Sequence, residues 1–151
     1  MAELREDDIA AAILRGPDAI IAADAEGVIR FWNPGAERIF GFGSDEAVGQ
    51  SLDLIIPERL RARHWAGWWK VMETGRSRYG ETDLLKVPSL RKDGSKISVE
   101  FTISLMLGPD GKIFGMAATL RDVTRAFNEI KELHKKLAAQ SRPQGQPGDV
   151  A

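Results

Sequence analysis

The sequence contains no cysteine, which excludes disulfide bonds, thiolate metal sites, a cysteine nucleophile and a chromophore attached through cysteine. Long hydrophobic runs are also missing, since none approaches the roughly 18 residues that a membrane-spanning helix needs. The acidic start MAELREDDIAAAIL does not have the pattern of a signal peptide. The net charge of −1 argues against bulk attraction to nucleic acid or to an anionic membrane. We therefore expect a cytoplasmic protein that binds neither.

The residues that are present fit one globular domain with short extensions. The chain has 151 residues, of which 43% are hydrophobic and 28% charged, and this is enough to bury a hydrophobic core. It shows no phosphate-binding loop, no metal-ligand cluster and no matched nucleophile and base. We therefore expect a protein that is not an enzyme.

Hydrophobic patterning predicts two strands and several short helices in the first half of the chain. Residues 19–33 hold two apolar runs joined by a Glu-Gly step, where glycine supplies the positive φ of a tight hairpin. Asn33 can cap the helix that the following proline opens; contact with a ligand is its alternative role. The longest internal helix is expected between Pro57 and Gly75.

Three β-rich runs follow, separated by the turn sequences RKDG and GPDG. In SKISVEFTISLML every second residue is apolar, which predicts a strand with one buried face; these residues are Ile97, Val99, Phe101, Ile103 and Leu105. Consecutive antiparallel strands with helices on one side predict a two-layered α+β fold. The helical insert then covers one face of a five-stranded sheet, with space for a small ligand between them.

The last helix carries apolar residues at alternating spacings of three and four, the pattern of a coiled-coil seam: Val123, Phe127 (or Ala126), Ile130, His134 (or Leu133) and Leu137. We expect a homodimer through residues 124–139, with the flanking helix of residues 1–17 taking part. The globular domain itself is expected over residues 18–124 and the helix over 125–140. Residues 141–151 are polar and rich in proline and glycine, which predicts a disordered tail.

Several separated segments resemble a PAS sensor domain of the S-box type. DAEGVIRFWNPGAERIFGFGSDEAVGQ resembles its first half, and RKDGSKISVEFTIS and GMAATLRDVT resemble its second half. The resemblance implies the PAS fold, with helices that cup a pocket, and the sensing of a small molecule, gas or redox state. It also implies relay through the C-terminal helix to a histidine kinase or a transcriptional regulator. The alternative is a ligand-free PAS domain for protein–protein interaction. No kinase, cyclase or DNA-binding segment follows the helix, so we expect a longer chain or a partner to supply the output.

Residues 61–69, RARHWAGWW, gather three of the four tryptophans and one of the two histidines. His64 shares a helical face with Trp68, next to the stripe of Trp65 and Trp69, so it is expected to face the pocket. The segment resembles the FixL-type haem PAS domains, whose haem histidine follows an arginine–any residue–arginine pattern. This resemblance implies His64 as the ligand of the haem iron and Arg61 as a partner of the haem propionates.

The sequence also departs from that family. Leu85 aligns where those sensors place an arginine on the following strand, and Thr82 and Lys86 are the polar side chains nearby. The alternative to a bound haem is that the bulky Trp68 itself occupies the haem volume. The full predicted cofactor site consists of His64, Trp68, Leu85, Val99, Phe101, Ile103 and Arg61. Its candidate occupants are haem, a non-covalent flavin or a small apolar molecule; a packed histidine without cofactor is the alternative.

Overall fold

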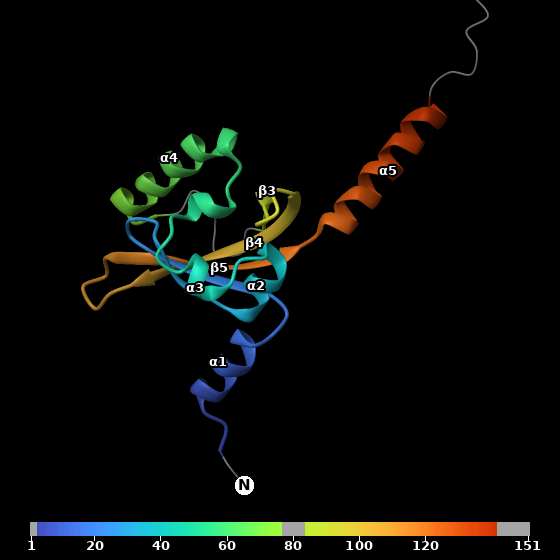
Figure 1. Ribbon diagram of the computed structural model, residues 1–151. Coiled ribbons are helices and arrows are strands. Elements are labelled where there is room, and N and C mark those ends of the chain that lie inside the picture. The colour runs from blue at the N-terminus through green and yellow to red at the C-terminus, as the bar shows by residue number, and fades with distance from the viewer. Residues whose placement is uncertain (1–2, 77–83, 142–151) are drawn as a thin grey trace, which may run out of the picture.

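Five strands form one antiparallel sheet in the spatial order β2-β1-β5-β4-β3 (Figure 1). The structure is a computed structural model that describes residues 3–76 and 84–141. The strands are β1 (Ala19–Asp24), β2 (Ile29–Trp32), β3 (Leu85–Leu90), β4 (Lys96–Leu107) and β5 (Ile113–Asp122). The predicted five-stranded antiparallel sheet is confirmed.

The helices cover one face of this sheet or project from the domain. They are α1 (Glu6–Leu14), α2 (Pro34–Phe40), α3 (Ser44–Ala47), the 3-10 helix η1 (Leu52–Ile55), α4 (Glu58–Thr74) and α5 (Thr124–Ser141). Figure 1 shows α4 over the sheet, α1 leaving on the side away from α4, and α5 extending outward. The helical insert therefore lies as the sequence predicts.

Local signals fix several of these boundaries. Gly27 closes the β1–β2 turn with φ of 79°, a backbone conformation that is unfavourable for residues other than glycine. The Asn33 side chain accepts a hydrogen bond from the backbone N–H of Ala36 at 2.9 Å, so it caps α2 as predicted. Pro57 precedes α4, and Gly75 ends it in the left-handed conformation.

The core has two clusters between the sheet and the helices. The first lies under α2, α3 and η1 and contains, among others, Ile29, Phe40 and Val99. The second lies under α4 and contains Ala23, Trp68 and Met116. Alternate residues of strand β4 pack in both clusters, as the sequence pattern predicts: Ile97, Val99 and Phe101 in the first, and Ile103 and Leu105 in the second.

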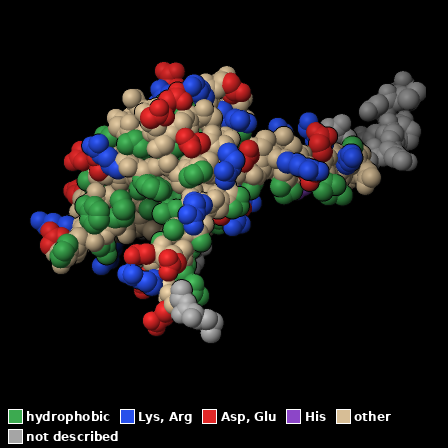
Figure 2. All heavy atoms as spheres, turned by 60° about the horizontal axis from the view of Figure 1, so that its bottom comes forward, with side chains coloured by type: hydrophobic (Ala, Val, Ile, Leu, Met, Phe, Trp, Pro, Cys, Tyr) green, Lys and Arg blue, Asp and Glu red, His purple; other side chains and the backbone are tan. Residues whose placement is uncertain are grey.

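The two flanking helices have little contact with the core. No residue of α1 or α5 is buried. The apolar residues of α5 are about half exposed, at 49–60%, and lie three or four residues apart: Phe127, Ile130, Leu133 and Leu137. Figure 2 shows hydrophobic side chains along one side of this projecting helix. The predicted seam is thus present and unburied in the single chain. The predicted tail falls almost entirely outside the described residues.

No helix in the described ranges, 3–76 and 84–141, is long and apolar enough to cross a membrane.

Candidate functional site

The centre of α4 carries an aromatic cluster that faces the sheet. The His64 ring lies 4.6 Å from the Trp65 ring, edge to face, and 5.9 Å from the Trp68 ring, measured between centroids. The two indoles meet edge to face at 5.7 Å. Trp69 stacks on Trp65 but is half exposed. His64, Trp65 and Trp68 therefore form one packed unit, and Trp69 lies at its solvent side.

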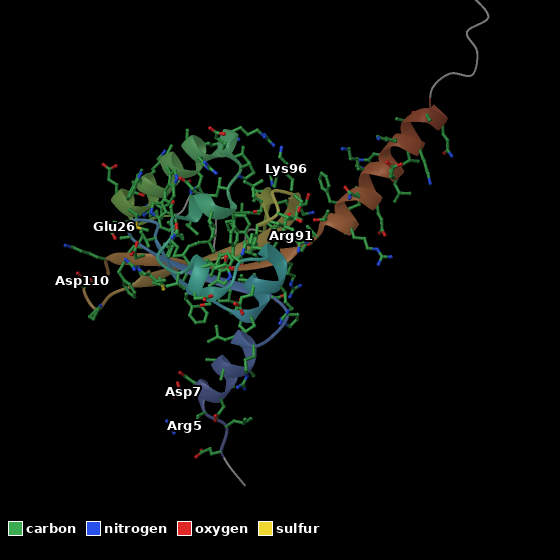
Figure 3. All side chains as sticks on the ribbon, in the orientation of Figure 1. Arg5, Asp7, Glu26, Arg91, Lys96 and Asp110 are labelled. Carbon is green, nitrogen blue, oxygen red and sulfur yellow. The ribbon has the colours of Figure 1, made fainter. Side chains whose placement is uncertain are left out.

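Trp68 occupies the space between α4 and the sheet. Its side chain is 7% exposed and packs in the cluster with Ala23 and Met116. Its indole N–H donates to the carbonyl of Ala25 at 2.9 Å, so the polar edge of the ring is satisfied inside the core. Ala25 belongs to the β1–β2 turn, whose next residue, Glu26, is labelled beside α4 in Figure 3. Trp68 thus connects α4 to the first hairpin.

Trp65 and Arg61 connect α4 to η1. The Trp65 indole N–H donates to a carboxylate oxygen of Asp53 at 2.7 Å. Arg61 donates to the backbone carbonyls of Ile56 and Asp53, at 3.0 and 3.3 Å. The Trp65 ring also lies against Gly27, where an added Cβ would come within 2.2 Å of ring carbons. The guanidinium of Arg61 is therefore engaged within the protein.

His64 has the chemistry of a metal ligand. Its Nδ1 is buried and has no hydrogen-bond partner among the described residues. Burial lowers the pKa of the imidazole below its ordinary value of 6.5, and the carboxylate of Asp53 opposes this shift only in part. His64 is consequently neutral at pH 7, with a nitrogen lone pair available, which is the state that metal ions bind.

The lowered pKa of His64 predicts a pH dependence of stability. As pH falls below 6.5, the unfolded chain takes up a proton at this residue before the folded chain does. The stabilisation is complete above pH 6.5 and is lost as pH falls through the lower pKa of the folded state. We expect urea unfolding between pH 7.5 and 5 to show this loss in the wild type and a smaller one in His64→Gln. His134→Gln, on the exposed surface of α5, is the matched control and should keep the wild-type dependence; equal profiles for wild type and His64→Gln would contradict the prediction.

The other predicted site residues are divided between the two core clusters. Ile103 packs against the cluster that contains Trp68, whereas Val99 is fully buried in the first cluster and Phe101 packs against it. Leu85 is half-buried and pairs with Phe101 across β3 and β4. Lys86 is exposed, and its ammonium group forms a salt bridge with the carboxylate of Glu100 at 3.8 Å. Thr82 lies outside the described residues.

His64 offers a suitable nitrogen ligand for a haem iron, but the space beside its ring is too small for the haem. Two indoles lie within 6 Å of the His64 ring, and each is held by a hydrogen bond to another element. Arg61 donates to η1. Two surface hollows formed by described residues lie on α5 and beside Pro57 and Leu90, and neither is lined by His64 or Trp68. A planar macrocycle requires that Trp65 and Trp68 leave their positions.

Sequence reasoning missed Asp53 and Ala25. Asp53 contacts Trp65 through its side chain and Arg61 through its backbone, and Ala25 supplies the acceptor for Trp68. Asp53 follows an ordinary serine cap at the start of η1, and a backbone carbonyl has no sequence signature. These partners lie 8–43 residues away along the chain, so no local pattern indicates them.

Comparison with known proteins gives a consistent family assignment. The PAS fold family matches residues 15–126. The chain is 28% identical over 134 residues to the sensor protein FixL of Bradyrhizobium diazoefficiens, covering 83% of this chain and 25% of that protein. It is 33% identical over 112 residues to the oxygen sensor protein DosP of Escherichia coli, covering 74% and 14%. The matched region thus spans a quarter or less of these curated relatives.

Solved structures show the same fold. A PAS domain from Colwellia psychrerythraea superposes with a TM-score of 0.68 at 23% identity, covering 79% of this chain and 97% of that one. A sensory box histidine kinase/response regulator from Burkholderia thailandensis gives a TM-score of 0.64 at 15% identity, covering 92% and 100%.

Proposed function

This chain belongs to the PAS family, and on that premise we propose that it is a signal-relay module that dimerises through α5. The single observation that carries the proposal is the apolar stripe of α5, which no described residue buries and in which four large side chains remain about half exposed. An 18-residue helix that projects from its domain gains most of its stability from packing an apolar face. A second copy of the same stripe, in coiled-coil register, supplies that packing.

The joint between the sheet and α5 is suited to transmitting movement. The backbone N–H of Thr124 donates to the Asp122 side chain at 3.0 Å, and the Thr124 hydroxyl accepts from the N–H of Ser98 on β4 at 3.0 Å. The N–H of Val123 donates to the carbonyl of Ser98. Because the first turn of α5 is bonded to β4 and β5, a shift in these strands changes the direction of the helix.

Ile130→Asp tests the relay through dimerisation. A carboxylate in the middle of the seam must either be buried without a partner or separate the two helices. We expect a largely dimeric wild type at micromolar concentration and a dissociation constant raised by about 100-fold or more in the variant. Analytical ultracentrifugation measures this constant, and circular dichroism verifies that the domain stays folded.

Asn128→Asp provides the matched control, since it adds the same charge on the opposite side of α5. It should leave the dissociation constant within about threefold of the wild type. A monomeric wild type, or equal dissociation constants for the two variants, would contradict dimerisation through this stripe.

The protein that receives the signal is proposed from the similarity of this chain to known sensor proteins. The chain resembles sensor proteins and a sensory box histidine kinase, which supports a kinase or a regulator as the recipient of the signal. In this role the chain binds and relays rather than catalyses.

For the cofactor, the donor chemistry of His64 supports haem, whereas the packing of Trp65 and Trp68 supports a domain that works with a filled interior. We favour the filled interior, because both indoles are bonded in place.

A further inference from the structure

We propose that the Trp68 indole is a built-in occupant of this PAS domain, which excludes haem from His64 and leaves, when removed, a binding site for a planar aromatic molecule with an N–H donor. The proposal concerns the interior under α4 and does not depend on dimerisation through α5.

The position of Trp68 has the properties of a bound aromatic ligand. The indole is almost fully buried between α4 and the sheet, against Ala23 and Met116. Its one polar atom donates to the carbonyl of Ala25 at 2.9 Å, 43 residues away along the chain. An aromatic ring in an apolar space with one directed hydrogen bond is the arrangement by which small-molecule sites fix a ligand.

Small residues leave room for the two indoles at two points, among larger neighbours such as Leu52, Ile103 and Leu105. Ala23 on β1 lies in the cluster with Trp68, and Gly27 in the adjacent turn leaves space for the Trp65 ring, since an added Cβ there would lie 2.2 Å from ring carbons. The small residues Ala23 and Gly27 of the first hairpin and the two large indoles of α4 are complementary in volume, as in a close-packed core. The tryptophans therefore belong to this interior and are not displaced surface residues.

His64 is explained by the same packing. Its buried Nδ1 has no partner among the described residues, and the ring lies nearly perpendicular to the Trp65 indole and tilted by 35° to the Trp68 indole. An imidazole in this position is kept neutral by its apolar surroundings. The neutral ring contributes to packing, and a metal centre on it requires the space that Trp68 occupies.

The first experiment compares the wild-type protein with His64→Gln, and both keep the Trp68 ring. An equimolar amount of hemin is added and reduced with dithionite, and the Soret region is recorded for the wild type and for His64→Gln. We expect identical spectra, because Trp68 keeps haem away from His64. Any residual haem binding is then independent of His64. A sharp Soret band in the wild type that is lost in His64→Gln would overturn the proposal.

The second experiment tests the site directly with indole as the probe. Trp68→Ala removes the ring and creates a cavity that the rigid neighbours fill only in part. Indole at about ten times its dissociation constant should raise the melting temperature of Trp68→Ala by about 4 °C and leave the wild type unchanged. Benzene, which lacks the N–H donor, should raise it less.

Trp69→Ala is the matched control, because Trp69 lies one residue further on the same helix and is half exposed. It should not respond to indole. If Trp68→Ala does not fold, Trp68→Leu retains more apolar volume and is used with the same probe. A folded variant at position 68 that shows no shift with indole, or a shift of equal size in Trp69→Ala, would overturn the proposal.

Discussion

Asn33→Ala is expected to lower the free energy of unfolding by about 3–4 kcal/mol. The side chain is 1% exposed and makes four hydrogen bonds. Its oxygen accepts from the N–H groups of Ile20 and Ala36, at 2.7 and 2.9 Å. Its nitrogen donates to the carbonyls of Leu14 and Asp18, both at 2.9 Å. Alanine leaves these four backbone groups without their partner. Urea denaturation monitored by circular dichroism measures the loss.

The matched control is Asn128→Ala, which removes the same amide from an exposed position on α5. Its unfolding free energy should change by less than about 0.5 kcal/mol. A loss of under about 1 kcal/mol in Asn33→Ala would mean that water or a relaxed backbone satisfies the four groups, and the network would then not hold the domain together.

Gly35→Ala is expected to lower the free energy of unfolding by about 2–3 kcal/mol, although alanine is the better helix former. An added Cβ would lie 2.0 Å from the carbonyl oxygen of Asp18 and 2.5 Å from its carbon, so α2 must move away from the start of β1. Overpacking of this kind costs about 1–3 kcal/mol and occasionally more, whereas the gain in helix propensity is at most about 1 kcal/mol. The clash therefore decides the sign, and thermal unfolding followed by calorimetry measures it.

Gly67→Ala is the same chemical change in another helix and has the opposite expected sign. Gly67 lies in the middle of α4, and a Cβ there meets no atom within 4 Å. Alanine should raise the free energy of unfolding by about 0.5–1 kcal/mol. If both substitutions were stabilising, α2 would not be packed against β1 as closely as the structure has it.

Asn33 and Asp18 attach α1 to the domain. Asn33 bonds to the last residue of α1 and to the first strand, and Asp18, between α1 and β1, pairs with Arg121 on β5 at 3.0 Å. Arg121 immediately precedes Asp122, the residue that bonds to the start of α5. The roots of both flanking helices therefore meet where the start of β1 lies beside the end of β5, and the loss of Asn33 should loosen α1 first.

The candidate site was only partly predictable. The helical spacing correctly places His64 beside Trp68 in one aromatic cluster. The role of Arg61 depends on the path of η1, which brings two carbonyls to its guanidinium. Whether His64 faces a cofactor or an indole depends on the volume left between α4 and the sheet, and periodicity carries no information about volume.

The local elements of this protein can be read from its amino-acid sequence. The Glu-Gly turn, the Asn33 cap, the Pro57 and Gly75 boundaries of α4, the alternation along β4 and the apolar stripe of α5 all follow from short-range stereochemistry and periodicity. Two features depend on tertiary packing: β1 lies between β2 and β5, and Trp68 bonds to Ala25 and fills the interior. These contacts join distant parts of the chain, and their choice depends on how side-chain volumes fit together once the sheet has formed.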